Sequence, residues 1–230
     1  MKQGRIAIFD SGVGGLKILE TLKKRLKGED FIYAFDRSHA PYGNRRERYI
    51  IKATKSVCSR LIKEGAKLIV VGCNTATAVA IDELRKTFPL SVIGVEPPVK
   101  EAEKEGGKTL VLCTVALSKS GKFKRLISDF KGELIVSAQP SLASEVEEKI
   151  ADLTQLEPTV CKILRQNGKI DNIVLGCTHY YHLSPLIKKI APSVKIFTAC
   201  EGVGKRVETV LKEKDLCNGR GKGFIRYLYL

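Results

Sequence analysis

One short pattern occurs twice in this chain, and its two copies lie 104 residues apart. Each copy is an apolar run followed by Gly, Cys and a polar residue: LIVVGCNTATA, which contains Cys73, and NIVLGCTHYYH, which contains Cys177. A short run of β-branched and apolar residues is typical of a strand buried on both faces of a parallel sheet. The repetition therefore predicts two halves of the same design, each with a cysteine at the end of a strand.

The rest of the chain supports this division into two halves. Apolar runs alternate with longer stretches that carry apolar residues at helical spacing, which is typical of an α/β fold with mainly parallel sheets. Strands of the first half recur in the second at offsets of 103 or 104 residues. We predict two pseudosymmetric α/β lobes with the active site in the cleft between them. The predicted strands cover residues 5–10, 31–35, 68–72, 91–95, 109–113, 134–138, 172–176 and 194–198, and the clearest helices 13–26, 45–62, 75–88, 182–190 and 203–211.

The formal net charge of +15 suggests a different function. Lys and Arg number 40 against 25 Asp and Glu, and such an excess is typical of nucleic-acid-binding proteins. The basic residues, however, are spread over predicted helix faces, and no zinc-finger, helix-turn-helix or RNA-recognition motif accompanies them. We therefore expect a solvated basic surface and no nucleic acid as partner.

The seven cysteines indicate a reducing compartment, because their number is odd and no C-x-x-C spacing suggests a disulfide framework or a zinc site. No apolar run reaches the roughly 18 residues that a membrane span needs. Asp10 comes before a signal-peptide core could form. We expect a cytoplasmic protein without a metal or a membrane partner. Five cysteines are expected to be small core residues: Cys58, Cys113, Cys161, Cys200 and Cys217.

The residues that could carry chemistry follow the predicted strands, where parallel α/β sheets bind their ligands. Asp10 and Ser11 follow the first strand, and each repeated cysteine follows its own. Because a helix N-terminus stabilises a thiolate, we expect the pKa of Cys73 and Cys177 to fall from about 8.5 toward neutrality. His179, two residues after Cys177, is placed to protonate, orient or activate a neighbouring group.

The turn DSGVGGL lacks the G-x-G-x-x-G spacing of a dinucleotide site. A tight turn whose backbone N–H groups approach an anionic group of a ligand fits it better.

Five motifs in this order closely resemble the glutamate racemases of the aspartate/glutamate racemase superfamily: FDSGVGGL, PYG, GCNTA, GVEP and GCTHY. The resemblance spans about residues 5–185. It implies two lobes, no pyridoxal phosphate or metal, a homodimer, and interconversion of L- and D-glutamate that supplies D-glutamate for peptidoglycan. It also implies a C-terminal helix that returns to the first lobe. We therefore expect residues 1–97 plus 201–230 to form the first lobe and residues 98–200 the second.

The resemblance also implies roles for individual residues. Cys73 would act on D-glutamate and Cys177 on L-glutamate, one thiolate removing the Cα proton while the opposite thiol delivers another. Asp10 would assist Cys73, His179 would assist Cys177, and Asp36 would at most orient its neighbours. The residues expected to hold the substrate are Ser11, Pro41, Tyr42, Gly43, Asn74, Thr75, Thr114 and Thr178.

Two departures from the family pattern bear on substrate choice. The second threonine of the family's T-x-x-T is Leu117 here, with Ser118 next to it, and the family's Asp-Ser near the eighth strand is Phe197-Thr198.

Several alternatives stay open. The chain could be a racemase of aspartate, a hydantoin or another related compound. A one-cysteine decarboxylase is disfavoured by the presence of both cysteines. A Cys-His hydrolase built on Cys177 and His179 would leave Cys73 without a role. A basic nucleic-acid-binding protein is the least favoured.

Overall fold

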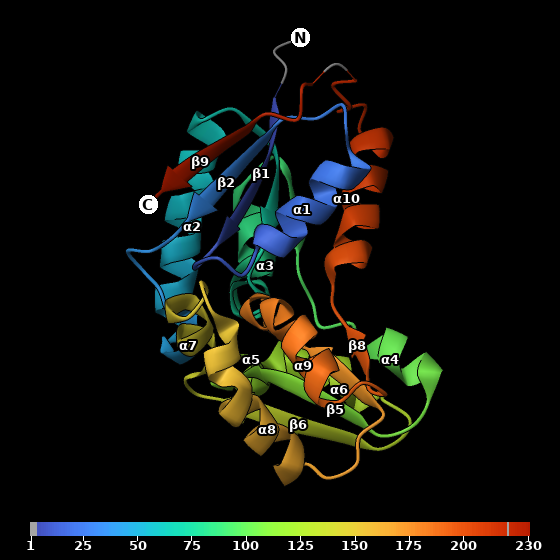
Figure 1. The fold of residues 1–230 in the computed structure, drawn as a ribbon. Helices are drawn as coiled ribbons and strands as arrows, with labels where there is room; N and C mark the ends of the chain where they lie inside the picture. The colour runs from blue at the N-terminus through green and yellow to red at the C-terminus, as the bar shows by residue number, and fades with distance from the viewer. Residues whose placement is uncertain (1–3, 220) are drawn as a thin grey trace.

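Two parallel sheets, one in each lobe, form the frame of the molecule (Figure 1). The computed structural model describes residues 4–219 and 221–230. The first sheet has the strand order β4-β3-β1-β2-β9 and the second β6-β5-β7-β8, and all paired neighbours are parallel. The strands are β1 Arg5–Asp10, β2 Phe31–Phe35, β3 Ala66–Val71, β4 Ser91–Gly94, β5 Thr109–Thr114, β6 Leu134–Gln139, β7 Asn172–Leu175, β8 Lys195–Phe197 and β9 Ile225–Tyr229.

The two sheets share one topology, which confirms the predicted fold class. When the second sheet is read as β8-β7-β5-β6, each strand takes the place of its counterpart in β4-β3-β1-β2. Each of the eight predicted strands is present, with ends within two residues of the expected ones. The repeated Gly-Cys corner thus follows equivalent strands in the two sheets. In the first sheet it follows β3, which pairs with β1, and in the second it follows β7, which pairs with β5.

Helices cover both faces of the first sheet, as its fully apolar strands require. In β1, Ile6 and Ile8 pack toward α1 and α10, whereas Ala7 and Phe9 pack toward α2 and α3. All four side chains are fully buried. These helices are α1 Leu16–Arg25, α2 Glu47–Lys63, α3 Asn74–Thr87 and α10 Cys200–Glu213.

The core of the second lobe is continuous with that of the first on one face. Leu112 and Leu175 belong to the same apolar cluster as Ile8, while Val111 and Val174 pack on the opposite face of their sheet. The remaining helices are α4 Val99–Glu105, α5 Val115–Lys119, α6 Gly121–Ser128, α7 Leu142–Glu148, α8 Glu157–Gln166 and α9 Ser184–Ile190, with 3₁₀ turns η1 Tyr42–Asn44, η2 Leu153–Leu156 and η3 Thr178–Leu183.

The helix expected over residues 182–190 begins later than predicted. Residues Thr178–Leu183 form the 3₁₀ turn η3, and α9 begins at Ser184, with Pro185 in its first turn. Proline is favoured there because its missing N–H has no partner in the first turn of a helix. Cys177 is therefore followed by a 3₁₀ turn, unlike Cys73, which directly precedes the α-helix α3.

The C-terminal segment returns to the first lobe: the helix predicted over residues 203–211 is α10, and the tail after it, for which the pattern predicted no structure, contains β9. Helix α10 packs against α1, where Arg25 pairs with Glu201 and Glu208 at 2.8 and 3.0 Å. Strand β9 then pairs with β2 at the edge of the sheet, Ile225 opposite Phe31. The C-terminal helix thus returns as the resemblance implied, while the division at residues 97/98 and 200/201 stays a prediction. Within the described residues, no helix combines the length and apolarity needed to cross a membrane.

A buried ion pair fixes the segment between α10 and β9. Lys67 Nζ lies 2.5 Å from Glu29 Oε2, and the two side chains are only 9% and 5% exposed. Lys67 also donates to the Leu216 carbonyl, and Glu29 accepts the Asn218 N–H at 2.8 Å. This pair therefore links the sheet to the tail.

We predict that Lys67→Met destabilises the chain by about 3 kcal/mol, because it leaves the Glu29 carboxylate buried without its cation. Urea unfolding measures the change. The double variant Lys67→Met/Glu29→Gln is expected to recover a large part of the loss, since it removes the unpaired charge as well. An unchanged unfolding midpoint in Lys67→Met would contradict the assignment.

Candidate active site

A cavity of about 230 Å³ lies where the carboxyl ends of the two sheets face each other. Cys73 enters it from the first lobe and Cys177 from the second, and each is 7% exposed. Two thiols at pseudosymmetric positions therefore share one enclosed space. The other lining residues are Ser11, Ala40, Pro41, Tyr42, Gly43, Thr75, Thr114, Ala143, Ser144, Glu147, Glu148 and His179.

Nine of the twelve predicted site residues line this cavity. The other three, Asp10, Asn74 and Thr178, are at most 2% exposed and do not line it. Thr178 and Asp10 are bonded to each other, and Asn74 Nδ2 donates to the Val95 carbonyl. Direct contact of these three side chains with a substrate stays a prediction. Asn74 Oδ1 is buried without a hydrogen-bond partner, so it remains available as an acceptor.

Asp10 is the most deeply buried carboxylate of the site. Its Oδ1 accepts the Gly12 N–H at 2.9 Å, and its Oδ2 accepts the Thr178 hydroxyl, from the other lobe, at 2.8 Å. Burial raises the pKa of Asp10 from 3.8 to about 6, and the hydrogen bonds and the positive charge of His179 hold it from rising further. At neutral pH the carboxylate is a stronger base than an exposed aspartate.

His179 lies between Cys177 and an acid that the sequence pattern did not reveal. Its Nδ1 is 3.9 Å from Cys177 Sγ, and its Nε2 is 2.8 Å from Glu147 Oε2. Although burial favours the neutral ring, the hydrogen bonds with Cys177 and Glu147 raise the pKa of His179 well above 6.5. The two hydrogen bonds therefore favour the protonated form of the ring.

The pKa of the Cys73 thiol is raised, whereas the position of Cys73 at a helix N-terminus predicted a lowered pKa. The first turn of α3 does contribute, since the Ala76 N–H points at Sγ from 3.5 Å. Burial and the negative charge of Asp10 outweigh that contribution and raise the pKa of Cys73 above its ordinary value. The prediction of a lowered pKa was wrong for Cys73, because it considered the helix and not the buried carboxylate.

Two further contacts shape the cavity wall. The Thr75 and Thr114 hydroxyls, one from each lobe, are hydrogen-bonded at 2.9 Å. Tyr42 donates its hydroxyl to Asp36, whose other oxygen lies 2.6 Å from His39 Nδ1. Asp36 is fully buried and does not line the cavity, so its contacts are those of a residue that orients Tyr42.

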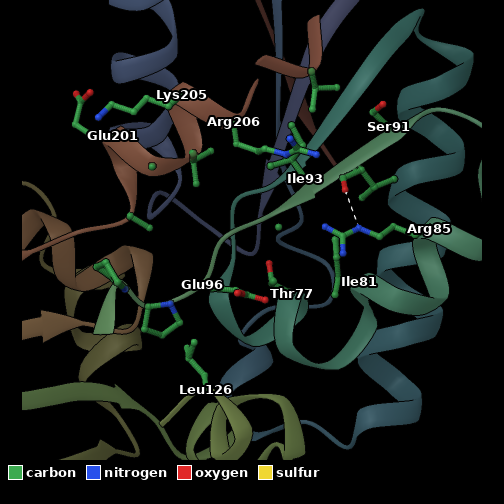
Figure 2. Close-up of a pocket in the computed structure, with 18 of the residues that line it drawn as sticks. Thr77, Ile81, Arg85, Ser91, Ile93, Glu96, Leu126, Glu201, Lys205 and Arg206 are labelled. Atoms are coloured by element: carbon green, nitrogen blue, oxygen red, sulfur yellow. Dashed lines mark hydrogen bonds between the residues drawn. The ribbon is translucent and has the colours of Figure 1, made fainter. Parts of the chain in front are cut away.

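A larger groove of about 1050 Å³ contains none of the predicted site residues (Figure 2). Its wall combines residues of α3 and β4 with residues of α10, and charges of both signs, such as Arg85, Glu96 and Arg206, face it. Volume alone therefore does not locate the chemistry. Among the described residues, no three His, Cys, Asp or Glu side chains are arranged to hold a metal ion.

The sequence profile of the Asp/Glu/Hydantoin racemase family matches residues 15–200. The chain belongs to this family. Its similarity to glutamate racemases extends over nearly its whole length. The glutamate racemase of Herpetosiphon aurantiacus is 37% identical over 239 residues, which cover 99% of this chain and 93% of that protein. That of Pseudomonas aeruginosa is 33% identical and covers 94% of this chain and 84% of its own length.

Solved structures of glutamate racemases have the same fold. Isoform RacE1 from Bacillus anthracis matches with a TM-score of 0.87 at 29% identity, covering 100% of this chain and 89% of that one. The enzyme from Aquifex pyrophilus matches with a TM-score of 0.77 at 33% identity, covering 98% and 88%. The family resemblance inferred from the five motifs is thereby confirmed.

Glu147 is the unpredicted site residue with the most direct chemical contacts. The other lining residues that sequence reasoning missed are Ala40, Ala143, Ser144 and Glu148. Glu147 lies on α7, inside the sequence LASEVEE, where a glutamate is usually a solvated helix residue. In the structure its Oε2 accepts the Val13 N–H at 2.8 Å and contacts His179. This role depends on tertiary packing, which places α7 against the glycine-rich turn that follows β1 in the first lobe.

Leu117, which replaces the family's second threonine, does not line the cavity. It is 1% exposed and packs with Cys113 and Phe123 in the core of the second lobe. Ser118 does not line the cavity either, because its hydroxyl donates to the Val115 carbonyl. Thr114 is therefore the one residue of this T-x-x-T position that reaches the site.

We predict that Asp10→Asn gains stability relative to the wild type as the pH rises. The raised pKa means that the folded chain holds this proton more readily than the unfolded one. The folded state therefore loses on the order of 3 kcal/mol as the pH rises from about 4 through 6, a loss that asparagine does not suffer. Unfolding in urea at pH 4.5 and pH 8 measures the difference.

Asp82→Asn is the matched control for this titration. Asp82 is exposed and its pKa is lowered by Lys122, so its replacement should slightly reduce stability at pH 8. A stability difference between Asp10→Asn and the wild type that stays constant across this range would show that Asp10 does not carry the raised pKa.

Proposed function

We propose that the chain interconverts L- and D-glutamate by proton transfer at Cα between Cys73 and Cys177, without a cofactor. The observation that carries this proposal is the pair of thiols that line one small cavity from opposite lobes. Inversion of a carbon centre in place needs a base on one face and an acid on the other. Two pseudosymmetric lobes supply these groups at equivalent positions.

The proton transfers follow from this arrangement. For D-glutamate, the Cys73 thiolate removes the Cα proton, and the Cys177 thiol delivers its proton to the opposite face. The enzyme is left with a protonated Cys73 and a deprotonated Cys177, which is the state that L-glutamate requires. Asp10 accepts the Cys73 proton when that thiol must ionise, and His179 exchanges protons with Cys177.

The cavity wall supports the remaining requirements of this chemistry. A Cα–H bond is a very weak acid, so the thiolate must be desolvated and held in line with it. Hydroxyls of Ser11, Thr75 and Thr114 reach the space where the carboxylates of a bound glutamate would lie. Donors at that place stabilise the charge that grows on the α-carboxylate as the proton leaves. Asn74 does not line the cavity, but its Oδ1 has no hydrogen-bond partner, and the proposal assigns it to accept from the substrate ammonium group.

The cellular setting is part of the same proposal. All seven cysteines are free, which fits a reducing cytoplasm, and D-glutamate formed there would serve peptidoglycan synthesis. We also propose a homodimer. The exposed aromatic side chains of Phe224 and Tyr227 at the edge strand would be covered in such an assembly. Sedimentation velocity that finds only monomers at micromolar concentration would contradict the dimer.

Racemisation of aspartate is the competing function, because the family includes racemases of more than one substrate. The two substrates differ by one methylene, which a single pocket discriminates by about 10- to 200-fold.

We predict that the purified chain racemises L-glutamate without added cofactor, and that Cys73→Ala and Cys177→Ala each lower kcat by at least about 1000-fold. The loss of circular dichroism at a wavelength of amino-acid absorption measures the rate. Cys161→Ala, on the surface helix α8, is the control and should keep full activity. Turnover by either single cysteine variant at the wild-type rate would refute the two-thiol mechanism, and equal turnover of aspartate would refute the specificity.

A further inference from the structure

Arg37 lies at the start of the segment that leads from β2 to the cavity wall formed by residues 40–43. Its guanidinium carbon is 5.6 Å from the centre of the Phe35 ring and 5.3 Å from that of Tyr229. These two rings stack on each other, with centroids 4.9 Å apart and planes within 5°. An arginine placed over aromatic faces is held by cation–π attraction. Arg37 is therefore a positioned cation on the outside of the segment that borders the cavity.

The cavity itself presents negative charge to an approaching ligand. Glu147, Glu148 and His179 line it, and no Lys or Arg does among the described residues. Glu147 is paired with His179, whereas Glu148 is in none of the ion pairs of the described residues, so its negative charge has no partner at the rim. A glutamate substrate carries two carboxylates and one ammonium group, so this rim would repel it. A cation close to the rim would offset the repulsion by the Glu148 carboxylate.

The positive charge of Arg37 reaches this rim. Burial raises the pKa of Glu147, but the hydrogen bonds from His179 and Val13 and the charges of His179 and Arg37 lower it below its usual range. None of the ion pairs formed within residues 4–219 and 221–230 includes Arg37. Its charge is thus not neutralised by a paired carboxylate.

The C-terminal residue Leu230, directly after β9, is hydrogen-bonded to the backbone on both sides of Arg37. The Leu230 N–H donates to the Phe35 carbonyl at 2.9 Å, and the Ser38 N–H donates to the Leu230 carbonyl at 3.0 Å. Tyr229, the residue before Leu230, supplies one of the two rings. The end of the chain therefore fixes the backbone on either side of Arg37 as well as the stack beneath it.

We propose that Arg37 attracts the carboxylates of the substrate to the cavity entrance, and that Tyr229 is the positioning residue that keeps it there. This inference rests on the proposed function, because it assumes a dianionic amino acid as substrate. It assigns a role to the C-terminal strand, which supplies none of the lining residues of the cavity. Arg37 acts on approach and binding, and the proton transfers stay with the two thiols.

Steady-state kinetics on glutamate test this role. In Arg37→Gln, kcat/KM should fall about threefold at low salt through a higher KM, with kcat unchanged, since one charge acts across several ångströms of water. The fall should disappear at high salt, and Arg37→Lys should retain much of the wild-type value. Arg60→Gln, which removes an exposed charge at the far end of α2, is the matched control and should change neither parameter.

Tyr229→Ala should raise KM, as Arg37→Gln does. Tyr229→Phe should keep the wild-type KM, because phenylalanine preserves the ring stack. The tyrosine side chain is 66% exposed, so its loss is compatible with folding. A fall in kcat with unchanged KM in Arg37→Gln, or an equal effect of Arg60→Gln, would overturn the proposal.

A second measurement does not depend on racemase activity. Iodoacetate is anionic and iodoacetamide is neutral, so the ratio of their alkylation rates at Cys73 and Cys177 reports the potential at the entrance. Peptide-resolved mass spectrometry separates these sites from the other cysteines. The ratio should fall about threefold in Arg37→Gln and remain unchanged in Arg60→Gln. An unchanged ratio in Arg37→Gln would refute the role of Arg37, whereas absent racemisation by the wild type would refute only the proposed function.

Discussion

The hydrogen bond from Thr178 to Asp10 joins the two lobes at the centre of the site, and the rest of the arrangement depends on it. A fully buried carboxylate is stable only when its oxygens accept hydrogen bonds. Asp10 accepts one from the Gly12 N–H of its own lobe and one from the Thr178 hydroxyl of the other lobe. Closure of the lobes therefore completes the environment of Asp10. The same closure brings Thr178 and the neighbouring Cys177 over the first lobe.

The glycines of the turn DSGVGGL permit this close approach. A Cβ at Gly14 would lie 2.6 Å from Thr178 Oγ1 and 2.7 Å from His179 N, and a Cβ at Gly12 would lie 2.2 Å from Glu147 Oε2. Each of these atoms belongs to the second lobe, and Thr178 Oγ1 and Glu147 Oε2 also form the hydrogen bonds to Asp10 and His179. The glycine-rich turn thus allows the two lobes to contact each other closely. This role agrees with the absence of the G-x-G-x-x-G spacing of a dinucleotide site.

Much of the fold was predictable because its signal is local. The eight strands of the two lobes are continuous apolar runs, and the matched offsets indicated the shared topology before any coordinates. Strand β9 was not predicted, because IRYLY follows a Gly- and Lys-rich stretch and becomes a strand only through pairing with β2. Glu147 was missed for a similar reason, since a glutamate on a short helix gains meaning only when α7 packs against His179. The pKa of Cys73 depends on Asp10, a residue 63 positions away in the sequence.

The two halves are alike in topology and unlike in charge, and this difference suits a two-base reaction. Cys73 is beside a buried carboxylate, which together with burial favours its protonated form. Cys177 is beside His179, whose Nδ1 lies 3.9 Å from the sulfur and whose pKa is raised by its hydrogen bonds with Cys177 and Glu147. A two-base exchange requires one thiol to hold a proton while the other does not. Asp10 beside Cys73 and the His179–Glu147 pair beside Cys177 therefore give the two thiols unlike surroundings, so the two directions of the proposed exchange do not begin from equivalent states.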